Sequence, residues 1–300
     1  SSGDIEQWRS LTYPELAAQV IGLFATDISH DDLASLTAVA YGGGRFAAEE
    51  IVPLTALNDQ LTLVGLSEGP TLAFKDMAMQ FLGEALEHVL AQSDRVLNIL
   101  GATSGDTGSA AEHALRGRDR VSIFMLSPQG RMSAFQRAQM YSLEDANIHN
   151  IAVAGVFDDC QNLVKQLSED LEFKRGHSLG AVNSINFGRI SAQIPYYIWA
   201  WLRATDDLPA AEREGYEVSF AVPSGNFGNI LAAWYAKQIG APIERLLCAS
   251  NDNRVLTDFI NTGTYDISDR EFILTSSPSM DILVSSNLER QLFELTGRNG

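Results

Sequence analysis

The chain has 300 residues, of which 45% are hydrophobic and 20% are charged. These proportions are typical of a globular protein, and the length suits two domains or one large α/β unit. The formal net charge of −17 argues against nucleic acid as a partner, because phosphate backbones are bound by clustered Lys and Arg. Since no apolar run approaches the ~20 residues that span a bilayer, we also expect no membrane partner.

The cysteines and histidines form no metal-binding pattern. Cys160 lies in a helical pattern and Cys248 at the end of a strand pattern, as expected for small buried side chains in a reducing compartment. The five histidines are scattered along the sequence, so we expect no metal site. The chain begins with Ser1 rather than Met. We expect a cytoplasmic protein, and a lost organellar targeting segment stays open as an alternative.

Residues 4–60 are predicted to form a helical N-terminal segment, interrupted by the triplet Gly42-Gly43-Gly44. The spacing of apolar residues predicts helices over 13–24 and 31–40, a short strand over 61–66 and a helix over 75–90.

From residue 96 onward, a strand–loop–helix rhythm repeats. The apolar runs predict strands over 96–100, 121–126, 148–153, 218–222 and 245–250. Helices are predicted over 109–115, 133–141, 158–171, 190–202 and 230–239. The polar stretch 204–215 indicates a linker or domain crossing. This alternation predicts an α/β fold with a mainly parallel sheet covered on both faces. In such sheets, ligands bind where the carboxyl ends of strands lead into helices.

The stretch Pro223-Ser224-Gly225-Asn226-Phe227-Gly228-Asn229 follows a predicted strand and opens a predicted helix. Gly225 and Gly228 allow the backbone to approach a ligand closely. Free N–H groups and the helix dipole at such a position attract an anion. The spacing matches neither GxxxxGK[ST] nor GxGxxG, which disfavours a P-loop NTPase and a dinucleotide site. The alternative interpretation is an ordinary β–α turn.

A second loop of this kind covers residues 101–108. Its hydroxyl groups on Thr103, Ser104 and Thr107, together with several N–H groups, suit a carboxylate or a second phosphate. The alternative is a capped helix start with Ser104 or Thr107 as the N-cap.

Lys75 lies in the apolar run Gly69-Pro70-Thr71-Leu72-Ala73-Phe74-Lys75-Asp76, just before a helix. Shielding behind Leu72 and Phe74 would desolvate the amine and favour its neutral, nucleophilic form. Alone, a lysine at a helix start is usually a solvated surface charge. Together with the two loops, it indicates a reactive amine and a phosphate cradle, the requirements of a pyridoxal phosphate (PLP) enzyme.

At this point the sequence resembles a known family, the threonine synthases, which are fold-type-II PLP enzymes. Seven blocks occur in the family's order and cover most of residues 60–290: GPTLAFKDMAMQ (69–80), NILGATSGDTGSAAEHA (98–114), SPQGRMSAFQRAQMYSL (127–143), FDDCQNLVKQL (157–167), VNSINFGRI (182–190), VPSGNFGNILA (222–232) and SSPSMDILVSSNLER (276–290). The combination of FKD, ATSGDTG and SGNFGN differs from the corresponding loops of serine dehydratases and sulfhydrylases.

The resemblance implies two three-layer α/β/α domains with mainly parallel sheets, after the helical N-terminal segment. We expect this segment to cover residues 1–60. A larger domain, which binds the PLP phosphate, would combine 61–75 with 206–300, and a smaller α/β domain would cover 76–205. Compared with the family, the chain looks truncated at both ends, so the residue that meets the pyridine nitrogen is expected beyond residue 300.

The resemblance also implies roles for individual residues. Lys75 would carry PLP as an aldimine, and Asp106 would lie near the cofactor ring oxygen, where relatives carry Asn. The PLP phosphate would be held by Ser224, Gly225, Asn226, Phe227, Gly228 and Asn229. The substrate carboxylate would be bound by Thr103, Ser104, Gly105 and Thr107. The substrate side would be lined by Asn183, Ser184, Asn186 and Arg189.

Two arginines are candidates for the phosphate of the substrate. A guanidinium fork suits a phosphate group, which favours Arg189, with Arg131 as the second candidate. For each arginine, a surface ion pair is the alternative.

The implied reaction is the conversion of O-phospho-L-homoserine and water to L-threonine and phosphate, by γ-elimination and β-hydration. Three alternatives stay open. A PLP-dependent phospholyase would eliminate phosphate from a related amino-acid phosphate, a non-catalytic relative would only bind PLP, and a Rossmann-type oxidoreductase is disfavoured by the missing GxGxxG. The expected partner is a small anionic amino acid, and the protein is expected to be a monomer or homodimer.

Overall fold

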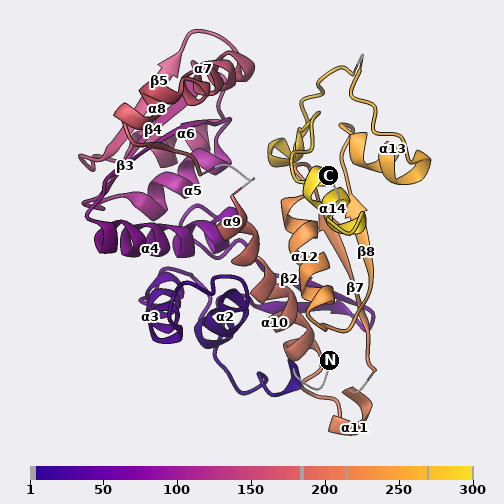
Figure 1. The fold of residues 1–300 in the computed structure, drawn as a ribbon. Helices are drawn as coiled ribbons and strands as arrows, with labels where there is room; N and C mark the ends of the chain where they lie inside the picture. The colour runs from indigo at the N-terminus through magenta and orange to yellow at the C-terminus, as the bar shows by residue number, and fades with distance from the viewer. Residues whose placement is uncertain (1–4, 183–185, 214, 269, 299–300) are drawn as a thin grey trace. The chain divides into compact units, whose positions relative to one another are not determined.

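A computed structural model describes residues 5–182, 186–213, 215–268 and 270–298 (Figure 1). The chain divides into two compact units. Unit 1 consists of Ser1–His30, Leu54–Val64 and Phe187–Gly300, and unit 2 of Asp31–Pro53 and Gly65–Asn186. This division differs from the expected domain boundaries. Residues 31–53 belong with unit 2, residues 187–205 belong with unit 1, and the crossing falls after Asn186 rather than in 204–215.

Unit 2 contains a four-stranded parallel sheet of order β5-β4-β3-β6. Its register places Leu97 opposite Val121 and Ile123 opposite Ile148. In chain order, its elements are α3 (His30–Tyr41), α4 (Lys75–Ser93), β3 (Leu97–Ala102), α5 (Asp106–Leu115), β4 (Val121–Pro128), α6 (Ala134–Tyr141), β5 (Ile148–Val153), α7 (Phe157–Glu169), α8 (Leu171–Gly176) and β6 (Leu179–Gly180).

Helices cover both faces of this sheet (Figure 1). Because successive strand residues point to opposite faces, Ile99 and Leu100 join different cores. Ile99 packs with Met79 of α4 and with the alanines of α5. Leu100 packs with Cys160 of α7. Unit 2 is therefore a three-layer α/β/α structure with a parallel sheet, as the alternating pattern predicted.

Unit 1 contains a second parallel pair of strands, β7–β8, against which α12 packs. Helix α10 packs against both α12 and α2. Its Trp199 packs edge-on against Tyr13 of α2, with ring centroids 5.6 Å apart. The elements of unit 1 in chain order are α2 (Tyr13–Gly22), β1 (Leu54–Asn58), β2 (Leu61–Val64), α9 (Phe187–Ser191), α10 (Ile194–Ala204), α11 (Ala210–Arg213), β7 (Val218–Pro223), α12 (Gly228–Gln238), β8 (Ile243–Ala249), α13 (Val255–Thr262), the 3-10 helix η1 (Pro278–Met280) and α14 (Leu288–Leu295).

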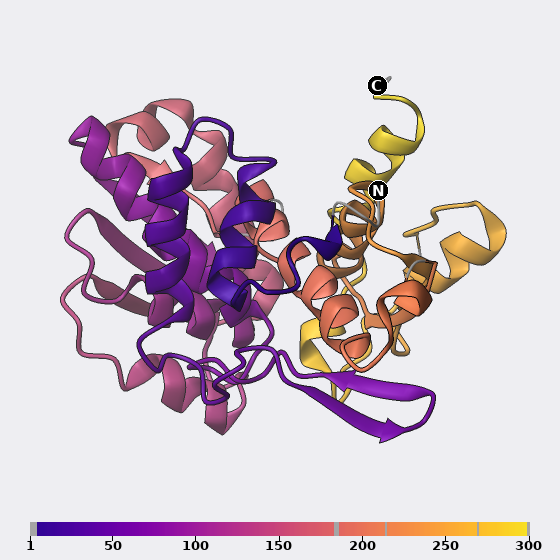
Figure 2. The ribbon, with the colours of Figure 1, turned by 90° about the horizontal axis from the view of Figure 1, so that it is seen from below.

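Three predictions about the elements were wrong. The N-terminal 60 residues are not all helical, because β1 pairs with β2 in the antiparallel hairpin that Figure 2 shows as a two-stranded ribbon. Its turn is favoured by Asn58, whose Oδ1 accepts a hydrogen bond from the N–H of Gln60 at 2.9 Å. The helix predicted over 190–202 is divided into α9 and α10. Pro195 has no N–H and lies in the first turn of α10, where none is needed.

The third wrong prediction is the helix over 158–171, which ends at Glu169 and is followed by the short α8. Asp170 stops it by leaving helical geometry, and its side chain caps α8 by accepting a hydrogen bond from the N–H of Phe173 at 2.9 Å. None of the helices in the described part of the chain has the length and apolar character of a membrane span.

Candidate active site

Lys75 is the first residue of α4, and its ammonium nitrogen lies 3.4 Å from Oδ2 of Asp106 at the start of α5. The side chain is 11% exposed, and its Nζ lies 5.8 Å from the centre of the Phe74 ring. The amine is therefore shielded, as predicted. The shield differs from the prediction, because Leu72 is 58% exposed. The Lys75 amine donates a hydrogen bond to the Asp106 carboxylate, which fixes its position.

The turn before Lys75 is closed by its neighbour Asp76. The fully buried Asp76 carboxylate accepts hydrogen bonds from the N–H of Thr71 at 2.8 Å and from its hydroxyl at 2.7 Å. Burial raises the pKa of Asp76, and the hydrogen bonds from Thr71 oppose that rise. A Cβ on Gly69 would lie 2.4 Å from Cβ of Asp76, so only glycine fits there. Asp76 thus fixes the turn that presents Lys75.

Thr103 organises the loop between β3 and α5. Its buried hydroxyl oxygen accepts hydrogen bonds from the N–H groups of Gly105 and Gly108, both at 2.9 Å. The N-cap position of α5 is Gly105, and the side-chain oxygen that accepts from the helix start belongs to Thr103 rather than to Ser104 or Thr107. Within the described residues, the hydroxyls of Ser104 and Thr107 make no hydrogen bond, and their N–H groups meet no acceptor.

Gln136 of α6 is a contact that the sequence analysis missed. Its side-chain amide donates to Oδ1 of Asp106, the carboxylate that also meets Lys75. Gly105 has a φ of +145°, and a Cβ there would lie 2.3 Å from the Gln136 amide. Ser133 caps α6 and orients Gln136 by donating to its Oε1 at 2.9 Å. The clue in the sequence is that the loops after adjacent parallel strands β3 and β4 share one edge of the sheet.

Helices α4 and α5 approach each other closely behind this pair. A Cβ on Gly83 would lie 2.6 Å from the carbonyl oxygen of Ala114, a distance that real Cβ atoms do not adopt.

Glu112, also on α5, is fully buried. Its Oε2 accepts a hydrogen bond from the Asn150 amide at 3.3 Å, and its Oε1 has no partner among the described residues. Burial raises the pKa of Glu112 to about 8.

In unit 1, the loop between β7 and α12 presents a run of N–H groups. The backbone N–H groups of residues 225–229 donate to no described residue. Phe227 adopts the left-handed conformation with φ 63°, and α12 begins at Gly228. Consecutive N–H groups at a helix start form an anion cradle. Ser224 is buried, and its N–H donates to the Ala249 carbonyl at 2.8 Å, which anchors the loop to β8.

The side chain of Asn229 is turned toward α10 rather than into the loop. Its Oδ1 accepts hydrogen bonds from Tyr197 at 2.7 Å and from Tyr196. Arg189, on the preceding helix α9, is 4% exposed. Burial lowers the pKa of Arg189 to about 10, which leaves the guanidinium charged at pH 7. The two tyrosines were missed by the sequence analysis, which had no signal for them beyond the aromatic composition of their helix.

The remaining candidates are less well placed. Arg131 is exposed in the turn after β4, and Asn186 precedes α9. Asn183 and Ser184 lie outside the described residues. The residues brought together by contacts are thus Lys75 with Asp106 in unit 2, and Asn229 with Tyr196 and Tyr197 in unit 1.

Comparisons with known proteins agree with the sequence resemblance. The family model "Threonine synthase N terminus" matches residues 1–41. A threonine synthase of Corynebacterium glutamicum is 52% identical over 300 residues, covering 98% of this chain and 61% of that relative. The chain therefore spans less than two thirds of this relative's length.

Two solved structures share the fold. A PLP-bound threonine synthase of Brucella melitensis superimposes with a TM-score of 0.92 at 44% identity, covering 100% of this chain and 62% of that one. The Escherichia coli threonine synthase has a TM-score of 0.83 at 32% identity, covering 100% of this chain and 66% of that one. Over the residues it spans, the chain belongs to the threonine synthase family of α/β proteins.

Proposed function

We propose that this chain carries the PLP site of a threonine synthase, and that the protein converts O-phospho-L-homoserine and water to L-threonine and phosphate. The observation that carries the proposal is the shielded Lys75 amine, held against Asp106 at the start of α4. Further support comes from the 52% identity to a threonine synthase and from the PLP named for the Brucella protein.

The residues present fit PLP. Lys75 Nζ is an amine that can bond to the aldehyde carbon, and the N–H groups of residues 225–229 can receive the phosphate without breaking a hydrogen bond to any described residue. When bound, the cofactor supplies an electron sink for negative charge that develops on the substrate carbons. Asn229 contributes its N–H group, because its side-chain oxygen is held by Tyr196 and Tyr197.

The side chains around Lys75 orient the substrate and move protons. Lys75 takes protons from Cα and Cβ of the substrate and returns protons to Cγ and Cα, as phosphate leaves Cγ and water adds to Cβ. Asp106 holds the Lys75 ammonium in place between these transfers and is itself held by Gln136. The N–H groups and hydroxyls of Ser104 and Thr107 bind the substrate carboxylate.

Arg189 binds the phosphate of the substrate. Its guanidinium is buried and charged. Tyr196, on the next helix α10, donates a hydrogen bond to Asn229 in the first turn of α12. A buried guanidinium pairs strongly with a phosphate dianion, because little water competes for its N–H groups. Arg131 is exposed, which makes it the weaker candidate.

The test is NMR of O-phospho-L-homoserine incubated with the protein and PLP. Threonine and phosphate in equal amounts are expected. A keto acid, or phosphate without threonine, would indicate a phospholyase, and an unchanged substrate would indicate a non-catalytic relative. Lys75→Ala should lose turnover and keep its fold by circular dichroism. Lys165→Ala is the matched control, because Lys165 is 71% exposed and belongs to unit 2. Near-normal turnover of Lys75→Ala would exclude the assignment.

A further inference from the structure

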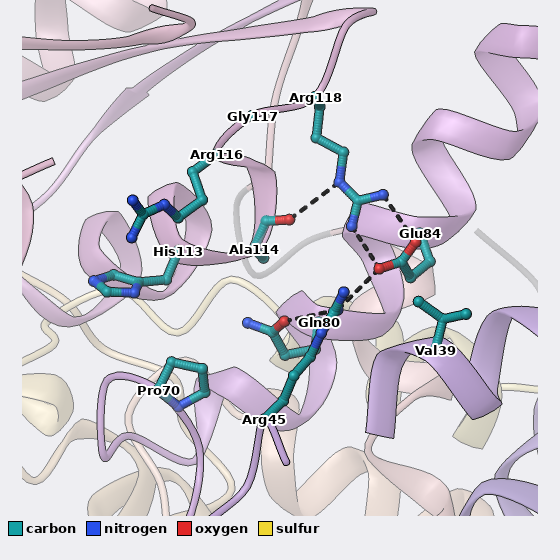
Figure 3. A pocket seen from close by; sticks show the side chains of 10 residues that line it. All are labelled: Val39, Arg45, Pro70, Gln80, Glu84, His113, Ala114, Arg116, Gly117 and Arg118. Carbon is teal, nitrogen blue, oxygen red and sulfur yellow. Dashed lines mark hydrogen bonds and ion pairs between the residues drawn. The ribbon is translucent and has the colours of Figure 1, made fainter. Parts of the chain in front are cut away.

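A pocket of about 450 Å³ lies within unit 2, on the side of α4 and α5 away from the sheet core (Figure 3). Its wall combines Gln80 and Glu84 of α4 with the end of α5 and the loop that follows. The lining residues are Val39, Arg45, Pro70, Gln80, Glu84, His113, Ala114, Arg116, Gly117 and Arg118.

The lining is positively charged, although the chain as a whole carries −17. The lining contains three arginines and one carboxylate, that of Glu84, and Arg116 also pairs with the Asp145 carboxylate outside the lining at 2.9 Å. Glu84 is held by Arg118 through two hydrogen bonds of 2.8 and 2.6 Å, and by Arg45 at 2.9 Å. Burial would raise the pKa of Glu84, but the two guanidiniums outweigh it and lower the pKa. Once the Glu84 and Asp145 carboxylates are both counted against the three arginines, an excess of one positive charge remains.

Gln80 adds an unused donor to this pocket. It is 2% exposed, and its Nε2 has no hydrogen-bond partner. Its Oε1 accepts from Arg45 at 3.2 Å, which fixes the orientation of the amide. Figure 3 shows Nε2 turned away from Arg45, toward the space beside Pro70 and His113. A buried amide donor without an acceptor is destabilising, so the donor left without a partner among the described residues indicates a ligand that accepts from it.

We propose that this pocket binds a small phosphate-type oxyanion, which accepts hydrogen bonds from Gln80 Nε2 and from the guanidiniums of Arg45 and Arg116. The excess of positive charge favours an anion, and guanidinium N–H groups match the oxygens of a phosphate. His113 adds no charge at neutral pH, because burial first and Arg116 second lower its pKa. This site is additional to the substrate and cofactor sites proposed above.

Binding is tested with inorganic phosphate, measured by isothermal titration calorimetry on the PLP-loaded protein at constant ionic strength. Loading with PLP keeps the probe away from the N–H groups of residues 225–229, and the pocket variants separate binding here from binding at Arg189, which does not line the pocket. Gln80→Leu removes the unused donor and replaces it with an apolar side chain of similar size. Arg45→Gln removes one guanidinium, and Glu84 keeps both of its hydrogen bonds to Arg118. Arg95→Ala is the matched control, an exposed arginine of unit 2 that does not line the pocket.

Saturable phosphate binding is expected for the wild type and for Arg95→Ala. Affinity should fall roughly tenfold in Gln80→Leu and in Arg45→Gln, the loss of one charge-assisted or buried hydrogen bond. Unchanged affinity in both variants would overturn the proposal, as would an equal loss in Arg95→Ala or an absence of saturable binding. If Gln80→Leu does not fold, Arg45→Gln decides, because the Arg45 side chain is 34% exposed and its loss leaves no empty core.

Discussion

Glu112→Gln should abolish a fall in stability that the wild type shows as pH rises from about 4.5 to 8. Glu112 is fully buried, and its only hydrogen bond to a described residue comes from the Asn150 amide. Burial raises its pKa from 4.5 to about 8. Between these values the folded protein holds the proton and the unfolded chain releases it, so stability falls as pH rises. Below pH 4.5 both states are protonated, and above pH 8 the loss is complete.

The magnitude follows from the same two values. Each pKa unit corresponds to about 1.4 kcal/mol, so the full loss is at most about 5 kcal/mol. Glutamine is neutral at every pH and has the same shape. The variant should therefore match the wild type at pH 5 and exceed it by roughly 2–5 kcal/mol at pH 8.5.

The assay is urea denaturation of both proteins at pH 5, 6, 7 and 8.5, compared as free energies of unfolding. The neighbouring His113 has a lowered pKa, caused mainly by burial, and so adds stability as pH rises through the acid range. That contribution is present in both proteins and cancels in their difference. Glu144→Gln, at an exposed glutamate of unit 2, serves as the control. A difference between wild type and Glu112→Gln that stays constant from pH 5 to 8.5 would refute the reasoning.

Three further substitutions test the supports of the candidate site. Thr71→Val removes a 2.7 Å hydrogen bond to the buried Asp76 carboxylate, so unfolding free energy should fall by about 1–3 kcal/mol; an unchanged urea midpoint would contradict this. Tyr197→Phe removes one of the hydrogen bonds that Asn229 Oδ1 accepts, and it should weaken PLP binding, measured by cofactor absorbance. An unaltered dissociation constant for PLP would contradict this expectation. Gly105→Ala places a methyl group 2.3 Å from the Gln136 amide at a φ of +145°, so turnover on O-phospho-L-homoserine should fall at least tenfold; near-wild-type turnover would show that the loop can rearrange.

The elements that sequence predicted best are those whose pattern is local and buried. The strand at Ile148–Val153 was predicted with its observed bounds, and the parallel α/β arrangement followed from alternating apolar runs. The strand Leu54–Asn58 was missed, because four of its five residues are exposed and leave no periodic pattern. The break before α10 was missed because apolar residues continue through it, although Pro195 marks the position.

The same distinction holds for the candidate site. Lys75 and the loop 224–229 were identified from short local patterns. The contact of Gln136 with Asp106 joins residues 30 positions apart, and it exists because β3 and β4 are neighbours in the sheet. The contact of Tyr197 with Asn229 likewise depends on how α10 packs against α12. Contacts of this kind are set by topology, which one sequence does not encode in any short segment.

The close approach of Gly83 to Ala114 has a geometrical consequence for Lys75 and Asp106. Lys75 lies eight residues before Gly83 on α4, and Asp106 lies eight residues before Ala114 on α5. At 1.5 Å per residue, both intervals are about 12 Å. The two helices contact each other at both ends of these intervals, so they run parallel. The distance between the helices at Gly83 therefore helps to set the distance between their N-termini, where the Lys75 ammonium and the Asp106 carboxylate meet. A single methyl group added about 12 Å away would therefore change the distance between the Lys75 amine and the Asp106 carboxylate, although neither residue is substituted.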